Sequence, residues 1–171
     1  MRKSQLLAHL RGERDDWEHA LNHVGTVRFG IGGVSGHWST RDIVAHIMAR
    51  EQYLADRLKE IHQGQSLPAC KTQDELDTFL EEFGYPDFES PLLPEEQGNE
   101  WVVVKYRDIP FKDLIMLESH AFEALHENIM ALSEEQLNEH NLAERVVRDT
   151  YKHYRQHAAD IRKRFKTPLI R

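Results

Sequence analysis

The stretch STRDIVAHIMAREQYLADRLKEIH, residues 39–62, decides the fold of this chain, because it joins a helix start to a long apolar stripe. Ser39 precedes Asp42 by three positions, the spacing of a capping box with aspartate in place of the usual glutamate. The apolar residues that follow recur with the period of a helix that buries one face: Ile43, Ile47, Leu54, Leu58 and Ile61. We therefore predict a helix over about 40–62, ended by Gly64. His46 lies on its inward face.

The segment before this helix shows the same periodicity. Residues 3–24 place four apolar side chains at helical spacing: Leu6, Leu10, Trp17 and Leu21. Between them stand charged residues that we assign to the polar surface of an amphipathic helix: Arg11, Arg14, Asp15 and Glu18. Gly25 and the glycine-rich stretch 30–36 then indicate a turn or loop before the next helix.

A third helix begins near Pro110, since proline is tolerated in a first turn and Asp108 can cap it. Its predicted face consists of apolar residues at helical spacing: Leu114, Leu117, Ala121, Leu125 and Ile129. Ser133 and Gln136 then have the spacing of a second capping box, which predicts a short further turn of helix.

The fourth predicted helix spans about 142–166, with Asn141 as its candidate cap. Its inward face would carry Val146, Thr150, His153, His157 and Ile161. These four helices, with few strand signals, predict an all-α fold: a four-helix bundle with a long crossover between helices two and three.

That crossover, residues 64–110, holds five of the six prolines, at 68, 86, 91, 94 and 110. We expect a short helix at about 73–83 within it. The run Trp101–Val104 is apolar and β-branched, so we expect it to be extended or to pack across the bundle. A connection of this length is usually functional or contains small elements of its own.

Length and composition limit the classes of function. The 171 residues suit one domain, 1–171. The net charge of −7 argues against non-specific nucleic-acid binding, so no nucleic-acid partner is expected. Cys70 is the one cysteine, which excludes an internal disulfide and fits a reducing compartment. With no signal-peptide pattern and no apolar run of membrane-spanning length, we expect a cytoplasmic protein without a membrane partner.

His153 and His157 are the first candidates for chemistry, because residues four apart lie on one face of a helix. Two imidazoles so placed can reach one ion, and His46 is the best third ligand from another helix. A histidine pair at this spacing is a weak signal in a chain with eleven histidines, and a buried histidine is often part of the core. The three together favour a metal site, since one ion would give each buried imidazole a partner.

The other candidate functional residues are weaker than these three histidines. His19 and His23 have the same spacing as the first pair but stand beside charged residues, so we expect them to be solvated. Arg50 and Glu51 follow His46 and are interpreted as ordinary surface charges, with an outer-shell role as the alternative. Cys70 is interpreted as a spare loop thiol. The glycine-rich stretch lacks the lysine and preceding strand of a phosphate loop.

Three motifs resemble a known family, the DinB/YfiT-like proteins. HWSTRDIVAHIMAREQYL (37–54) resembles their second-helix signature, and TYKHYRQHAADIR (150–162) is similar to their fourth-helix signature. ALSEEQL (131–137) resembles the turn that follows their third helix. The remaining crossover matches no part of the pattern.

The resemblance implies a metal-binding four-helix bundle with a divalent ion, Zn²⁺ or Ni²⁺, held by His46, His153 and His157. It also implies a homodimer. Some members are thiol-dependent transferases or isomerases that use a low-molecular-weight thiol, and a related branch contains self-protection proteins.

We expect a metal-dependent enzyme that transfers a thiol to a small electrophile, or isomerises one, with no catalytic residue assigned beyond the ligands. The alternatives are a non-catalytic small-molecule binding or self-protection protein, and a structural protein whose histidines belong to the core.

Overall fold

The structure, a computed structural model, describes residues 2–65, 68–139 and 141–166. Every regular element among these residues is a helix. The β contact found among them is a single isolated bridge between Ser35 and Trp38. The predicted all-α class is therefore confirmed. The helices are α1 (Lys3–Val24), a short 3₁₀ turn (Thr26–Arg28), α2 (Thr40–His62), α3 (Gln73–Phe83), α4 (Glu95–Lys105), α5 (Phe111–Ala131), α6 (Glu134–Glu139), α7 (Leu142–Asp149) and α8 (Tyr151–Arg164).

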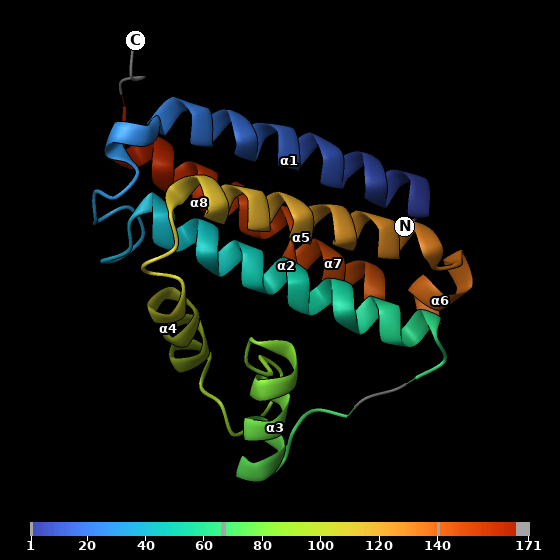
Figure 1. Cartoon of the computed structure of the whole chain (residues 1–171). Helices are drawn as coiled ribbons and strands as arrows, with labels where there is room; N and C mark the ends of the chain where they lie inside the picture. Colours follow the sequence, from blue (N-terminus) through green and yellow to red (C-terminus); the bar gives the residue numbers. More distant parts are fainter. Residues whose placement is uncertain (1, 66–67, 140, 167–171) are drawn as a thin grey trace.

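The long helices lie alongside one another, as Figure 1 shows. α2 packs chiefly against α5, α1 packs against α8, and α7 and α8 follow each other along the same side. The segment with α3 and α4 lies outside this group, and α4 contacts α2. One hydrophobic cluster joins the long helices, with Trp17, Leu54, Leu125 and Tyr154 among its buried members.

The start of α2 confirms the predicted capping box. The Ser39 hydroxyl accepts from the backbone N–H of Asp42, and the Asp42 carboxylate accepts from the backbone N–H of Ser39. Two otherwise unpaired backbone donors are thereby satisfied, which fixes where the helix begins. The reciprocal contact between Ser133 and Gln136 is present as well.

The crossover differs in part from its prediction. α3 has the predicted bounds, but Trp101–Val104 is helical and belongs to α4, so the extended alternative is wrong. Val102 and Val103 are buried where α4 meets α2. Strand propensity is a weak preference, and tertiary packing of this kind overrides it.

The predicted fourth helix is interrupted at Thr150, whose backbone leaves the helical region at φ −121° and ψ −92°. The Thr150 hydroxyl donates to the carbonyl of Val146, and a local side-chain bond of this type competes with regular helix geometry. Neither predicted side-chain cap forms. Asn141 precedes α7 without a capping bond, and α5 starts after Pro110 without a bond from Asp108.

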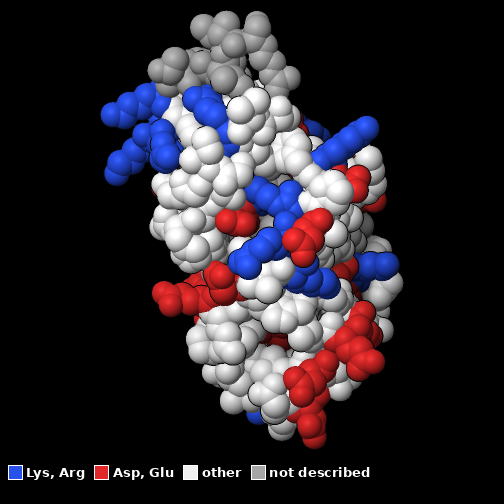
Figure 2. Space-filling model, turned by 60° about the vertical axis from the view of Figure 1, so that its left-hand side comes forward, with Lys and Arg blue, Asp and Glu red and all other residues white. Residues whose placement is uncertain are grey.

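Two charge assignments from the sequence are wrong. Arg14 and Glu51 are both buried in the core, where Arg14 also contacts Glu118 of α5. On the face drawn in Figure 2, basic and acidic side chains are intermixed. Among the described residues, no helix is both long and apolar enough to cross a membrane.

Candidate metal centre

The three histidines chosen from the sequence converge in space. His46 comes from α2, and His153 and His157 come from α8. Their ligand atoms all lie within 4.8 Å of one another, and Nε2 of His46 is 2.7 Å from Nε2 of His153. The ring centroids are 4.5, 4.6 and 5.6 Å apart. Three imidazole nitrogens this close together match the donor set of a zinc-type site.

The local folding of two helices produces this convergence. Four-residue spacing stacks His153 and His157 one turn apart on α8, beside the buried residues Tyr154 and Ile161. His46 lies in the most continuously buried part of α2, between Ala45 and Ile47. Contact between α2 and α8 then brings the two sets of rings together.

Burial keeps the three rings in the neutral form that binds metals. His46 and His157 are 5% and 3% exposed. Burial, together with the nearby His153 and Arg50, lowers the pKa of His46 well below its usual value. Burial and the neighbouring His157 lower the pKa of His153 to about 3. Burial also lowers the pKa of His157, although Asp160 partly offsets the effect.

Polar contacts around the rings support this orientation. Asp160 Oδ2 lies 3.5 Å from Nδ1 of His157, so a carboxylate faces the ring on α8. Asn99 of α4 lines the cavity with His46 and accepts from Nη2 of Arg50 at 2.9 Å. Nδ1 of His157 has no hydrogen-bond partner among the described residues, so Asp160 acts on this ring as a nearby negative charge. The donor set and its surroundings therefore fit a divalent ion.

A cavity of about 650 Å³ opens on the three histidines. Trp38 and Phe88 give it an aromatic wall, and the Trp38 ring centroid lies 5.1 Å from that of His46. The crossover contributes Phe88, Leu93 and Asn99 to its lining. This volume is that of a small-molecule pocket.

Each carboxylate that lines the cavity is paired with an arginine. Glu89 pairs with Arg145, Glu95 with Arg50, and Asp149 with Arg148. The three neutral histidines therefore face a cavity in which the carboxylates and arginines nearly balance one another.

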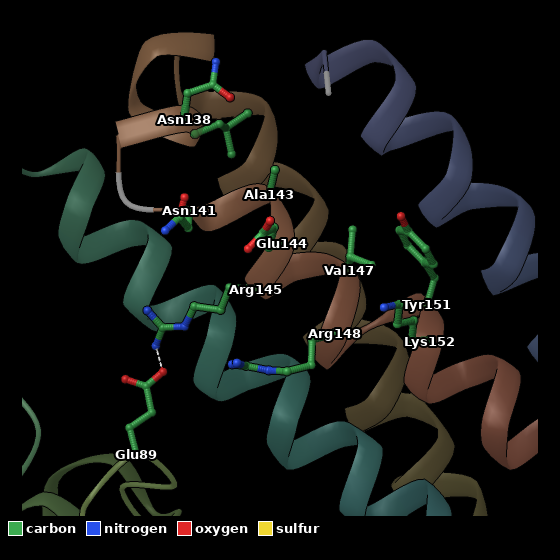
Figure 3. Close-up of a pocket in the computed structure, with 11 residues that line it drawn as sticks. Glu89, Asn138, Asn141, Ala143, Glu144, Arg145, Val147, Arg148, Tyr151 and Lys152 are labelled. Carbon is green, nitrogen blue, oxygen red and sulfur yellow. Dashed lines mark hydrogen bonds and ion pairs between the residues drawn. The ribbon is translucent and has the colours of Figure 1, made fainter.

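A larger cavity of about 940 Å³ adjoins this one and shares Glu89 and Arg148 with it. Figure 3 shows Arg145 extending from α7 to its ion pair with Glu89, with Arg148 one turn further along. None of the described residues that line it is a histidine. The candidate site is therefore identified by its histidine nitrogens and not by the volume of its cavity.

Behind the histidines lies a buried cluster that we call the core ion cluster: Arg14, Glu51, Glu118 and Tyr154. Arg14 binds both oxygens of Glu118, and its Nη1 lies 3.3 Å from Glu51 Oε2. The Tyr154 hydroxyl contacts the same Glu51 oxygen. Because these residues stand on α1, α2, α5 and α8, the cluster joins the two histidine-bearing helices to the rest of the fold.

The cluster is short of positive charge. Burial and the nearby Glu118 raise the pKa of Glu51 well above its usual value, more than Arg14 can lower it. Glu51 Oε1 is buried without a hydrogen-bond partner among the described residues.

The remaining sequence candidates lie apart from the centre. His19 is exposed, while His23 is half-buried and its Nε2 lies 2.6 Å from the carbonyl oxygen of Phe165, so only the first is solvated as predicted. Cys70 is buried, and its backbone N–H donates to Asp87. Sequence reasoning missed Asn99 and the core ion cluster, because their roles depend on contacts between distant segments.

Comparison with protein-family models, curated proteins and solved structures finds no match to this chain. The resemblance to DinB/YfiT-like proteins therefore consists of the two helical motifs and the turn described above. The case for a metal centre depends on the chain's own residues and their geometry.

Proposed function

We propose that this chain is a metal-dependent enzyme acting on a small molecule at His46, His153 and His157. One observation carries the proposal: α2 and α8 bring three neutral imidazoles, two buried and one half-buried, to within 4.8 Å at the wall of a cavity. Three protein ligands leave coordination positions open to a substrate, as in catalytic zinc sites.

A divalent ion held there, Zn²⁺ or Ni²⁺, would supply Lewis acidity and lower the pKa of a bound thiol or water. The chain's own residues would do the rest. Asp160 would place a carboxylate beside the ring of His157, and Asn99 lines the cavity with His46. Trp38 and Phe88 exclude water from one side of the cavity and contact the substrate's apolar body.

The reaction we propose is transfer of a low-molecular-weight thiol to a small electrophile, or isomerisation of one. It is supported by the resemblance to DinB/YfiT-like proteins. The arrangement of α1, α2, α5 and α7–α8 around one core supports the four-helix bundle with a crossover that this family implies. The same resemblance supports a homodimer, for which sedimentation should give twice the chain mass of 20.1 kDa.

A non-catalytic binding or self-protection protein is the second candidate. It is favoured by the pairing of Glu89, Glu95 and Asp149 with arginines, which leaves none of these cavity carboxylates as an unpaired general base. Ligand-dependent thermal stabilisation without turnover, in a screen of thiols with electrophiles, would identify it.

Metal analysis of protein purified without a histidine tag tests the proposal directly. We expect close to one divalent ion per chain, and its loss in a His153→Ala, His157→Ala double variant. A His19→Ala, His23→Ala double variant is the matched control, because it removes the same spacing from α1 and should keep the ion. Unchanged metal content in the first variant contradicts the assignment.

A further inference from the structure

Arg50 occupies a particular position in the cavity. It stands four residues after His46 on α2, so one helical turn separates the two side chains. Its guanidinium lies 4.0 Å from the ring centroid of Phe88 and lines the same cavity as the three histidines. Stacking on an aromatic face holds the planar guanidinium in one orientation.

The guanidinium has donors to spare. Among the described residues its hydrogen bonds use Nη2, which donates to Asn99, while Nε and Nη1 have no bonded partner. Its one ion pair, with Glu95 at 3.6 Å, is long, and Glu95 is 80% exposed. A contact of this kind contributes little in water. The Arg50 side chain itself is only 16% exposed, and burial lowers its pKa despite Asp149 and Glu95.

With a divalent ion bound, the cavity would carry a net positive charge and would favour an anionic ligand. Glu89 and Asp149 are paired with Arg145 and Arg148, so the exposed Glu95 is the lining carboxylate left to face Arg50. A divalent ion on three neutral imidazoles would add two positive charges a helical turn away. A substrate that carries an anionic group would offset them.

We propose that Arg50 binds the carboxylate of a small substrate through a two-point contact, with the substrate's planar body against Trp38. This inference rests on the proposed function, because it names the class of substrate that the same site would take. A carboxylate matches two parallel N–H groups of a guanidinium, here the Nη2 hydrogen that Asn99 does not use together with a hydrogen of Nε or Nη1. A single guanidinium also fits one negative charge better than a doubly charged phosphate.

Calorimetric binding of phenylacetate to the Zn²⁺-loaded chain tests the proposal, with phenylacetamide as an uncharged probe of the same shape. We expect phenylacetate to bind at least about tenfold more tightly than phenylacetamide, and Arg50→Gln to remove most of that difference. Arg50→Lys, which keeps the charge but not the planar fork, should bind it at an intermediate affinity. Arg162→Gln is the matched control, since Arg162 pairs with Asp16 on the exposed surface.

The possible outcomes separate this inference from the proposed function. Wild-type affinity for phenylacetate in both Arg50 variants, with the metal retained, overturns the role of Arg50 and leaves the metal centre standing. Failure of the loaded wild-type chain to bind phenylacetate also overturns it. If the wild-type chain holds no metal, the proposed function fails, and Arg50-dependent binding of phenylacetate to the metal-free chain decides the inference. If Arg50→Gln does not fold, the affinity of Arg50→Lys for phenylacetate decides the role of Arg50.

Discussion

At the scale of the residue, Arg14 is the clearest case of a side chain whose role depends on what surrounds it. Along α1 it stands among charged neighbours, yet in the structure it is 2% exposed and contacts Glu51 and Glu118. The hydrogen bond with Glu118 raises the pKa of Arg14 although burial alone would lower it. The guanidinium is therefore charged at every pH at which the protein is folded.

Removing that charge should destabilise the fold strongly. Arg14→Met leaves Glu118 and Glu51 buried without a cation, and breaking a buried pair in this way costs about 3–5 kcal/mol. Urea unfolding of the variant measures the loss. Arg155→Met is the control, because that exposed arginine pairs with Glu13 on the surface and its removal should leave the free energy of unfolding unchanged. Equal stability of the two variants contradicts a structural role for the cluster.

The histidines should make the metal-free chain less stable in mild acid. Below pH 6.5 an unfolded histidine takes up a proton that the folded rings refuse, since their pKa values are lowered, that of His153 to about 3. Acid therefore favours the unfolded state as pH falls below about 6.5, and for His153 the effect continues toward pH 3 at roughly 1.4 kcal/mol per pH unit.

Chemical unfolding at several pH values between 6.5 and 5.5 measures this slope. A variant with glutamine at His46, His153 and His157 is the comparison, because contributions of all other groups cancel between the two proteins. The wild-type slope should be the steeper one. Parallel slopes would show that the rings are protonated in the folded chain.

At the scale of the element, the crossover acts as one wall of the site because it is fastened to α2. Asp87 is 3% exposed and accepts from the Tyr53 hydroxyl at 2.7 Å and from the backbone N–H of Cys70 at 2.8 Å. It also accepts from the backbone N–H of Glu89 at 3.1 Å. One carboxylate thus ties both arms of the crossover to a residue of α2.

Loss of the Asp87 carboxylate should make local opening of the crossover easier and leave the long helices unaffected. Asp87→Ala removes three hydrogen bonds, which we expect to lower the free energy of local opening by about 2–3 kcal/mol. Amide exchange over 68–105 should accelerate roughly 30- to 150-fold while α1 and α5 keep their protection. Metal content should not change, because no histidine ligand lies on the crossover. Asp108→Ala, at an exposed position, is the control; similar exchange in the two variants contradicts the fastening role.

The elements also show what the sequence can and cannot predict. α2, with its strong periodicity and start signal, has its predicted bounds, as does the short helix α3, and the three histidines follow from helical phase. α4 was missed, because packing on α2 outweighs its β-branched residues. The break at Thr150 was missed as well, because it is a local change of backbone angles at one residue and no periodic pattern encodes it. Asn99 meets Arg50 only once the crossover has folded back, and no local pattern carries that information.

At the scale of the whole molecule, the candidate centre joins α2 to α8, which meet less extensively than the pairs α2–α5 and α1–α8. An ion bound to the folded chain alone stabilises it by mass action, about 2.7 kcal/mol at a free concentration one hundred times the dissociation constant. For a chain of this size that is a rise in Tm of roughly 5–10 °C.

Chelation should reverse that stabilisation. Dipicolinate added to the metal-loaded protein should lower Tm by this amount, and returning Zn²⁺ should restore it. The His153→Ala, His157→Ala variant should melt at the same temperature with and without chelator. A wild-type Tm that ignores both additions contradicts the metal centre as a link between the helices.

The positions of the ligands along the chain have a consequence for synthesis. His46 and His153 are 107 residues apart, so an ion bound to both would close a loop of the polypeptide that contains the crossover and α5. A nascent chain has made one ligand long before the other two, and it cannot complete the donor set until α8 has been translated. Metal occupancy would therefore report that synthesis had passed α8, and chains truncated before it would lack the donor set.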